Sequence, residues 1–281
     1  MLKGRTDRMK NFEFNEETVE GGRFENIEYK NELLEEIQFI NTSFEKSDFS
    51  GTEFSNVEFD EIEAKEVNFE KCKMHSDQLN FKGNFEKCSW QEAEIDCIES
   101  ISESKFIKNN FRNTKFFNSG FDDCDLKNND FSKAFFDGSG FSGGILNNNI
   151  FIKTKLAGFF NYLQDKNSNF TEAILDCTSW DECRCTEDIF KGADMISACI
   201  ESTSYISCDF EDAKMTDCEF RESELTDCSF KDTELLDSTF TECTLKNIDF
   251  TSIKYKNVTF TDCQFENVTF TEQQKKDFGL E

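Results

Sequence analysis

Histidine and proline are nearly missing from this sequence. Its 281 residues contain one histidine, His75, and no proline. A single imidazole excludes any mechanism that needs two, and it excludes a metal site built from several histidines. Basic residues are also scarce, because 31 Lys and Arg stand against 58 Asp and Glu and leave a net charge of −27. This balance argues against a nucleic-acid-binding protein that works through a basic surface.

Long apolar runs are absent as well. None approaches the roughly 20 residues that a membrane span requires, and the N-terminus reads MLKGRTDRMKNFEF, which has no apolar secretory core. The thirteen cysteines are an odd number. We therefore expect reduced thiols in a cytoplasmic protein without a membrane segment. Strong acidity often accompanies disorder, but the 34 phenylalanines argue for a folded chain.

Large apolar residues recur at every fifth position. The longest uninterrupted run covers residues 170–270. The same period covers residues 14–79 and, after slips of the frame, residues 85–95 and 101–156. A small residue usually stands two positions before the large one, and polar residues fill the remaining places. A period of five fits neither a helix nor a flat strand, whose periods are 3.6 and 2.

Such a period fits a square solenoid whose large residues fill the axis and whose small residues pack beside them. The motif resembles that of the pentapeptide-repeat family over residues 14–270, and residues 1–13 would form an N-terminal tail or cap. The resemblance implies an all-β fold, a right-handed quadrilateral β-helix with four pentapeptides per coil. It would have roughly 13 coils and, at about 4.8 Å per coil, a length of roughly 60 Å.

Phenylalanines that lie one coil apart support this implication, because they repeat in register. The axial core predicted from these columns contains Phe111, Phe131, Phe151, Phe170, Phe190, Phe210, Phe220, Phe230, Phe240, Phe250, Phe260 and Phe270.

The repeat frame breaks near residues 80–84, 96–100 and 157–168, and a solenoid accommodates insertions as outward bulges. The third break has two interpretations: three distorted repeats that are one residue short, or one repeat that carries an outward loop. The loop is slightly favoured because an aspartate, Asp165, is a poor axial residue. A loop would make a candidate partner contact from Phe159, Phe160, Tyr162, Gln164 and Asp165.

The C-terminal residues 271–281 change character. Thr271 and Gln274 have the spacing of a capping box, which predicts a short capping helix. Phe278 and Leu280 would then lie over the open end of the solenoid, where an unpaired β-edge needs cover. These two residues are candidates for a monomeric cap or for a dimer contact. The resemblance allows both, because C-terminal ends pair in the topoisomerase-binding branch of the family.

Catalytic motifs are not found. The sequence has no glycine-rich phosphate loop, no GxSxG motif and no cysteine spacing typical of zinc. Nine cysteines fall on the small inward position, where we expect them to behave as small buried hydrophobes and not as disulfides. We expect no catalytic residues, no metal and no cofactor, and therefore no enzyme.

The charge is unevenly distributed. Residues 1–100 carry a net −13, residues 101–170 a net +2 and residues 171–281 a net −16. One interpretation is solubility. The other is DNA mimicry, since duplex DNA carries about one charge per 1.7 Å. The resemblance implies a protein partner, DNA gyrase or topoisomerase IV. The chain would bind this enzyme, without contacting nucleic acid directly, and would modulate it or protect it from inhibitors such as quinolones. The alternative is a β-helical interaction scaffold, a bacterial effector or adaptor with another partner.

Overall fold

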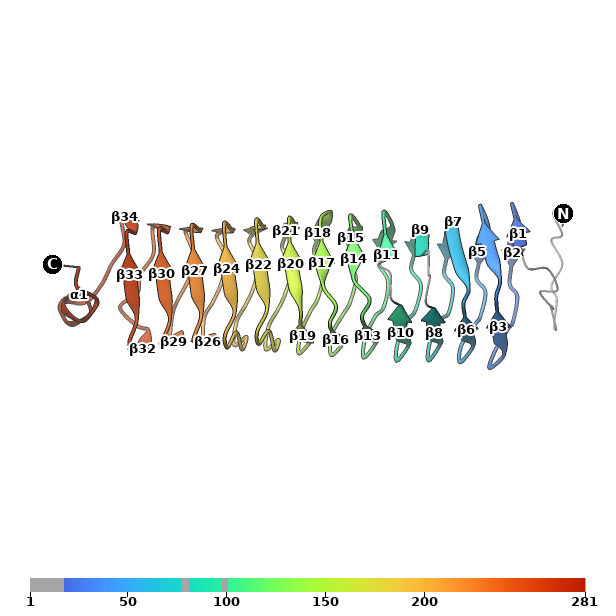
Figure 1. Ribbon diagram of the computed structural model, residues 1–281, viewed down its shortest axis with the longest axis horizontal. Helices are drawn as coiled ribbons and strands as arrows, with labels where there is room; N and C mark the ends of the chain where they lie inside the picture. The colour runs from blue at the N-terminus through green and yellow to red at the C-terminus, as the bar shows by residue number, and fades with distance from the viewer. Residues whose placement is uncertain (1–17, 77–80, 98–100, 281) are drawn as a thin grey trace. The chain divides into compact units, whose positions relative to one another are not determined.

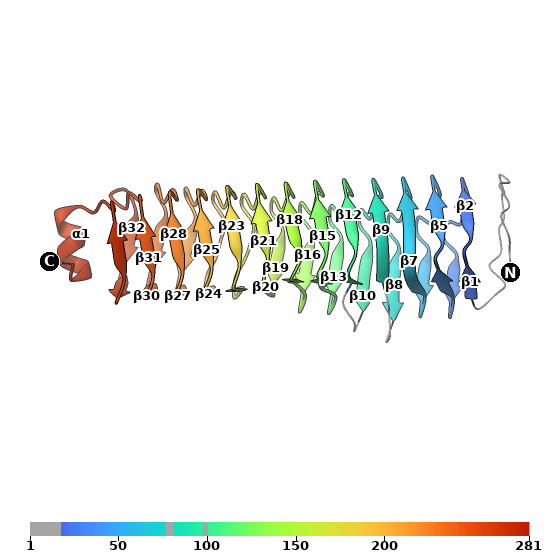
Figure 2. The same cartoon turned by 90° about the horizontal axis from the view of Figure 1, so that it is seen from above.

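The computed structural model describes residues 18–76, 81–97 and 101–280. These residues form two compact units, unit 1 (Met1–Gly140) and unit 2 (Phe141–Glu281). Each unit is a parallel β-solenoid, in which strands from successive coils lie side by side (Figures 1 and 2). The predicted all-β, four-sided solenoid with one short C-terminal helix is therefore confirmed.

Each coil has four sides, and we number them in chain order. Residues at the same place in successive coils form a column, and one coil's contribution to a column is a rung. On side 1 of unit 1, for example, Val19, Phe39 and Phe59 occupy successive rungs of one column.

In unit 1, sides 1, 2 and 4 carry strands. Side 1 consists of β1 (Thr18–Glu20), β4 (Gln38–Ile40), the first halves of β7 (Glu58–Lys65) and β9 (Phe81–Glu86), β11 (Ile101–Ser102) and β14 (Phe121–Asp122). Side 2 consists of β2 (Arg23–Glu25), β5 (Ser43–Glu45), the second halves of β7 and β9, β12 (Lys105–Ile107) and β15 (Asp125–Lys127). Side 4 consists of β3 (Leu33–Glu35), β6 (Glu53–Ser55), β8 (Lys73–Ser76), β10 (Glu94–Cys97), β13 (Lys115–Phe117) and β16 (Phe135–Asp137). Side 3 is held by single parallel bridges such as Glu28 to Asp48.

Unit 2 repeats this plan. Side 1 consists of β17 (Phe141–Ser142), β20 (Phe159–Asn161), β22 (Ser179–Asp181), β24 (Cys199–Glu201), β27 (Glu219–Arg221), β30 (Thr239–Thr241) and β33 (Thr259–Thr261). Side 2 consists of β18 (Ile145–Asn147), β21 (Gln164–Lys166), β23 (Arg184–Thr186), β25 (Ser204–Ile206), β28 (Glu224–Thr226), β31 (Thr244–Lys246) and β34 (Gln264–Glu266). Side 4 carries β19 (Lys155–Ala157), β26 (Lys214–Thr216), β29 (Glu234–Leu236) and β32 (Lys254–Lys256), and side 3 is again bridged. The helix α1 (Glu272–Phe278) follows the last coil.

The period of five follows from the corner geometry. The residue two places after most of the large ones has a positive φ, as at Asn26 (56°) and Asn247 (55°). This left-handed conformation turns the chain to the next side, and Asn, Asp and Gly adopt it most readily. The large residue before it points to the axis. The structure buries Phe111, Phe131, Phe151, Phe170, Phe190, Phe210, Phe220, Phe230, Phe240 and Phe250, and it leaves Phe260 and Phe270 half-buried in the last coil.

The axial rings stack along the columns. Phe111 and Phe131 have ring centroids 4.7 Å apart and an interplanar angle of 2°, and Phe170 and Phe190 have 4.9 Å and 2°. Each stacked ring contacts the rings one coil away, so each coil depends chiefly on the coils next to it.

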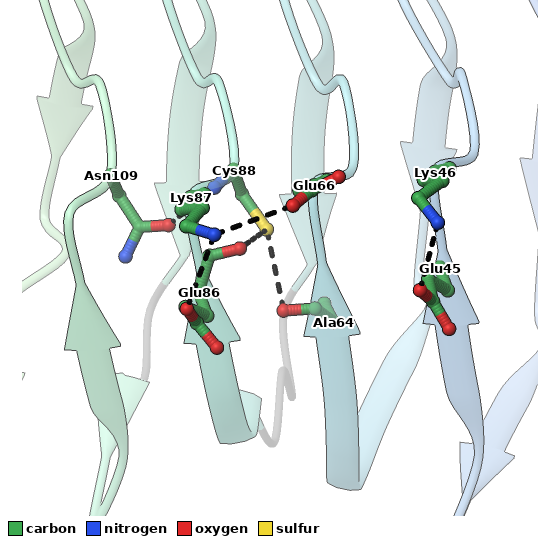
Figure 3. A network of polar contacts seen from close by, with 8 residues as sticks. All are labelled: Glu45, Lys46, Ala64, Glu66, Glu86, Lys87, Cys88 and Asn109. Carbon is green, nitrogen blue, oxygen red and sulfur yellow. Dashed lines mark hydrogen bonds and ion pairs between the residues drawn. The ribbon is translucent and has the colours of Figure 1, made fainter.

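The small position is a hydrogen-bond donor as well as a space filler. Thr42 Oγ1 donates to the carbonyl of Val19 over 3.0 Å, and Cys72 Sγ donates to that of Phe49 over 2.9 Å. Figure 3 shows Cys88 in this role, with its Sγ 3.5 Å from the carbonyl oxygen of Ala64. The acceptor is the backbone of an axial residue one coil earlier. Ser, Thr, Cys and Asn suit this position because each is short and carries a hydrogen to donate.

At the first break, the corner between sides 1 and 2 of unit 1 is shortened by one residue. Phe81 fills the axial position, Ile62 pairs with Gly83, and β9 crosses the corner with one residue fewer than β7. A Cβ on Gly83 would lie 2.3 Å from the carbonyl oxygen of Ile62, so this site requires glycine. Leu79, the axial residue expected here, lies outside the described residues. At the second break the flanking Ile95 and Ile101 are both buried.

The third break is not a loop, so the favoured interpretation of residues 157–168 is wrong. Phe160 pairs with Phe141 and Trp180, and Asp165 pairs with Leu146 and Cys185. The segment therefore forms distorted repeats that are one residue short. Asp165 is tolerated on the axis because the Ser168 hydroxyl donates to its Oδ1 over 2.5 Å, which satisfies one of its two carboxyl oxygens.

Candidate interaction surfaces

Side 1 of unit 2 is strongly acidic. Its outward positions on β22, β24, β27, β30 and β33, and the corner residues that follow these strands, lie in register from rung to rung. The side is seen between β20 and β33 in Figure 1. We call this surface the acidic side; its carboxylates are Asp181, Glu182, Glu201, Glu219, Glu222, Glu242 and Asp262, and its one cation is Arg221.

Ion pairing distinguishes the acidic side from the others. Lysines on the other sides of unit 2 bridge successive rungs, as Lys166 to Glu187 (3.5 Å) and Lys246 to Glu266 (2.9 Å) do on side 2. Between residues 141 and 280, the single ion pair on the acidic side joins Arg221 to Glu219 (2.6 Å). Exposed carboxylates without neighbouring cations repel one another, which favours a cationic partner.

The acidic side begins at an exposed aromatic residue. Tyr162 is 57% exposed and occupies the corner column that continues with Glu182. Its φ of 56° is the ordinary corner conformation of this fold, so the exposed ring and not the backbone distinguishes this position. Phe159, on the same side, is half-buried.

The remaining candidate contact residues divide between surface and core. Gln164 is exposed on side 2, whereas Phe160 (0% exposed) and Asp165 (3%) are buried and cannot touch a partner. Sequence reasoning placed these residues together because it treated the segment as a loop. It missed the excess of carboxylates over cations on side 1 of unit 2, which aligning the polar positions at a spacing of 20 residues would have revealed.

The C-terminal end is only partly covered. Thr271 caps α1 with its side chain, and Gln274 completes the capping box and donates from Nε2 to the carbonyl of Phe250 over 2.7 Å. Phe278 is buried, with its ring centroid 5.4 Å from that of Phe260. Phe265 stays 39% exposed.

Leu280, the other predicted cap residue, is half-buried. The helix thus shields part of the last coil and leaves an aromatic edge open, which is a second candidate contact.

Among the thiols of the described residues, that of the half-buried Cys263, in the last coil, has its pKa lowered to about 7 by a hydrogen bond from Cys243. Among residues 18–76, 81–97 and 101–280, no group of three or more His, Cys, Asp or Glu side chains is arranged to hold a metal ion. Burial raises the pKa of inward thiols such as Cys72, Cys88 and Cys124 to about 12, so they stay protonated. The part of the chain that the structure describes also contains no helix long and apolar enough to cross a membrane.

Two sequence models of known repeats match the chain. Pentapeptide repeats (8 copies) match residues 34–75, and a pentapeptide repeat region matches residues 203–278. Both segments form coils of four pentapeptides in the structure. The chain belongs to the pentapeptide-repeat family. A search of curated proteins finds no match.

Solved structures show distant likeness to this pentapeptide-repeat protein. HetL, a pentapeptide-repeat protein involved in heterocyst differentiation regulation in Nostoc sp. strain PCC 7120, is 12% identical with a TM-score of 0.34, over 89% of this chain and 90% of HetL. QnrB1, a plasmid-mediated fluoroquinolone resistance protein, is 12% identical with a TM-score of 0.29, over 94% and 95%. The periplasmic alginate epimerase AlgG is 8% identical with a TM-score of 0.41, over 84% and 77%. Likeness at this level carries nothing about function.

Proposed function

We propose that this pentapeptide-repeat protein is a non-enzymatic binding protein whose acidic side occupies the DNA-binding surface of a type II topoisomerase, gyrase or topoisomerase IV. Binding there would modulate the enzyme or protect it from inhibitors such as quinolones. One observation carries the proposal: seven carboxylates and one cation share one side of unit 2, with a single ion pair among them.

The spacing of these charges supports mimicry of a DNA strand. The rungs from β22 to β33 span roughly 19 Å at about 4.8 Å per rung. One DNA strand carries about six phosphates over that length, at one per 3.4 Å. The acidic side offers a net charge of −6 over the same rungs, from its seven carboxylates and Arg221.

The first experiment measures gyrase supercoiling against rising protein concentration, with and without a quinolone, at low and moderate salt. We expect inhibition or drug protection that weakens as salt rises, because contacts between an acidic surface and a basic groove are screened. Activity that does not respond to salt, or no effect on the enzyme, would contradict mimicry.

A charge variant assigns the effect to the acidic side. Replacing Glu182, Glu201, Glu222 and Glu242 with Gln removes four charges from it. The matched control replaces Asp212, Asp217, Asp227 and Asp237 with Asn, which removes four corner charges from other sides and keeps residues that tolerate a positive φ. The first variant should lose the effect on gyrase, and the control should retain most of it.

A second candidate function is an interaction scaffold that binds a different protein. Exposed apolar side chains favour it. Five isoleucines on sides 2, 3 and 4 of unit 2 are 36–45% exposed: Ile145, Ile150, Ile174, Ile189 and Ile196. A partner held through these residues would bind with little dependence on salt. Capture that survives high salt and is lost on replacing Ile174 and Ile189 with Ser would favour the scaffold.

A further inference from the structure

Asp188 brings a carboxyl group to a small inward position, where many side chains of unit 2 are hydrogen-bond donors. In the described part of unit 2, nine side chains at this position donate to the carbonyl of the axial residue 23 positions earlier. These donors are Cys183, Thr203, Cys208, Cys218, Cys228, Thr233, Ser238, Cys243 and Cys263. Asp188, fully buried on side 3, occupies the same position. An ionised carboxylate has no hydrogen to donate.

Asparagines at the equivalent position of unit 1 show what the position demands. Asn109 accepts the N–H of Cys88 at Oδ1 (2.8 Å) and donates from Nδ2 to the carbonyl of Phe85 (2.9 Å). Asn129 likewise donates to the carbonyl of Phe106 (2.8 Å). Each side chain therefore bridges two backbone groups, one with its oxygen and one with its nitrogen.

Asp188 reproduces the first half of this bridge. Its Oδ1 accepts the N–H of Ser168 over 2.7 Å. Its Oδ2 is buried and has no partner among the described residues. The carbonyl that corresponds to those of Phe85 and Phe106 is the backbone carbonyl of Asp165, 23 positions earlier. Oδ2 of Asp188 could bond to that carbonyl only if it carried a proton, because two oxygens form a hydrogen bond only with a proton between them.

The surroundings favour the neutral acid. The Asp165 side chain is buried beside it, and Oδ2 of Asp165 also lacks a partner in the described structure. Burial raises the pKa of Asp188, and the charge of Asp165 raises it further. The titratable groups around the pair are Lys166, Cys183, Cys185, Glu187, Tyr205, Cys208 and Cys228. Lys166, the cation among them, is exposed and ion-paired with Glu187 at 3.5 Å.

We propose that Asp188 is held as a neutral carboxylic acid that donates from Oδ2 to the carbonyl of Asp165, and that loss of this proton loosens the surrounding rungs of unit 2. The site is thus a buried proton-binding site that makes one part of the solenoid sensitive to pH. The proposal rests on the interior of unit 2 and is independent of any partner.

The decisive variant is Asp188→Asn, which supplies a permanent donor in the same shape. Hydrogen exchange of the segment 160–210 is compared between wild type and this variant at each pH, so that the intrinsic pH dependence of exchange cancels. We expect equal protection at pH 5 and about tenfold or more faster exchange in wild type at pH 9.

The converse variant, Asn109→Asp, should import the same pH response into the segment 101–130 of unit 1 and leave unit 2 unchanged. An infrared difference spectrum at neutral pH supplies a direct readout, because Asp188→Asn should remove a protonated carboxylic acid band. The proposal is overturned if Asp188→Asn is equally or less protected than wild type at pH 9, or if no acid band is lost.

Discussion

Ser168 Oγ donates to Asp165 Oδ1 over 2.5 Å inside unit 2, on an axis where the adjacent rungs hold Leu146 and Cys185. This bond explains how a solenoid accepts an acid at an axial position. It satisfies only one carboxyl oxygen, and the other remains buried without a partner in the described structure. Asp165 therefore lowers the stability of the coils around it, and the free-energy cost depends on whether its carboxyl group is protonated.

Replacing Asp165 with Leu should stabilise unit 2, most strongly at alkaline pH. Burial raises the pKa of Asp165 to about 7, well above that of an unfolded aspartate. A raised pKa means that the folded state binds more protons, so the wild-type stability falls as pH rises from about 4 through 7. Leucine removes this loss and matches Leu225 in the same column. Urea unfolding at pH 5, 7 and 9 tests the prediction, with Asp212→Asn as an exposed control. A leucine variant that is less stable than wild type at pH 9 would refute it.

The stacked phenylalanines should dominate stability. Phe190 is fully buried between Phe170 and Phe210, with centroids 4.9 Å from each. Phe190→Ala should destabilise unit 2 by about 3–5 kcal/mol, whereas Phe190→Leu should cost clearly less because it leaves a smaller cavity. Hydrogen exchange should locate the loss in the neighbouring rungs, since solenoid stability is a sum of local terms. Uniform loss over residues 101–280 would argue against that local description.

Gly83 should be irreplaceable at its corner. A methyl group there would lie 2.3 Å from the carbonyl oxygen and 2.9 Å from the nitrogen of Ile62, and backbone atoms cannot move away cheaply. Gly83→Ala should therefore lower the melting temperature and weaken protection across β7 and β9. Gly21→Asn is the matched control, because its Cβ meets nothing within 4 Å and asparagine tolerates the φ of 64°. Equal melting temperatures for the two variants would contradict the close approach.

If the small inward position requires a hydrogen-bond donor, serine and alanine should differ there in their effect on stability although they are similar in size. Cys218 donates from Sγ to the carbonyl of Met195 over 2.8 Å and is fully buried. Cys218→Ser keeps a donor and should be tolerated. Cys218→Ala removes this donor and leaves the carbonyl of Met195 with only the backbone N–H of Ala198 at 3.3 Å, so it should cost about 0.5–1.5 kcal/mol. Urea unfolding compares the two, and an alanine variant as stable as the serine variant would show that the position selects for size alone.

The sequence predicts the coils well because their cause is periodic. A large residue at every fifth place is visible without any structure, as in Phe170 and Phe190, and it dictates both the axis and the stacking. The breaks are harder, because their outcome depends on partners that lie 20 positions away. Asp165 looks unfit for the axis until it is aligned with Leu146 and Cys185 in the neighbouring coils, and that register is known only once the coils are built.

The acidic side could not be predicted from the sequence for the same reason. Residues 171–281 are visibly acidic, but composition does not tell which carboxylates have neutralising neighbours. Lys246 and Glu266 are paired by the rung spacing, whereas Glu242 and Asp262 share the acidic side without a lysine. The candidate surface therefore emerges only when the register of the coils is known.

The last prediction concerns the C-terminal end. Phe265 on β34 is 39% exposed, and no described strand pairs with β34 on its outer edge. We expect two copies to meet there, because an apolar, unpaired β-edge gains from cover. Light scattering should then give twice the chain mass of 32.7 kDa. Phe265→Glu should return the protein to one chain, whereas Thr226→Glu, which adds the same charge on β28 away from the end, should not. A wild-type protein that stays at one chain mass would instead assign Phe278 and Leu280 to a monomeric cap.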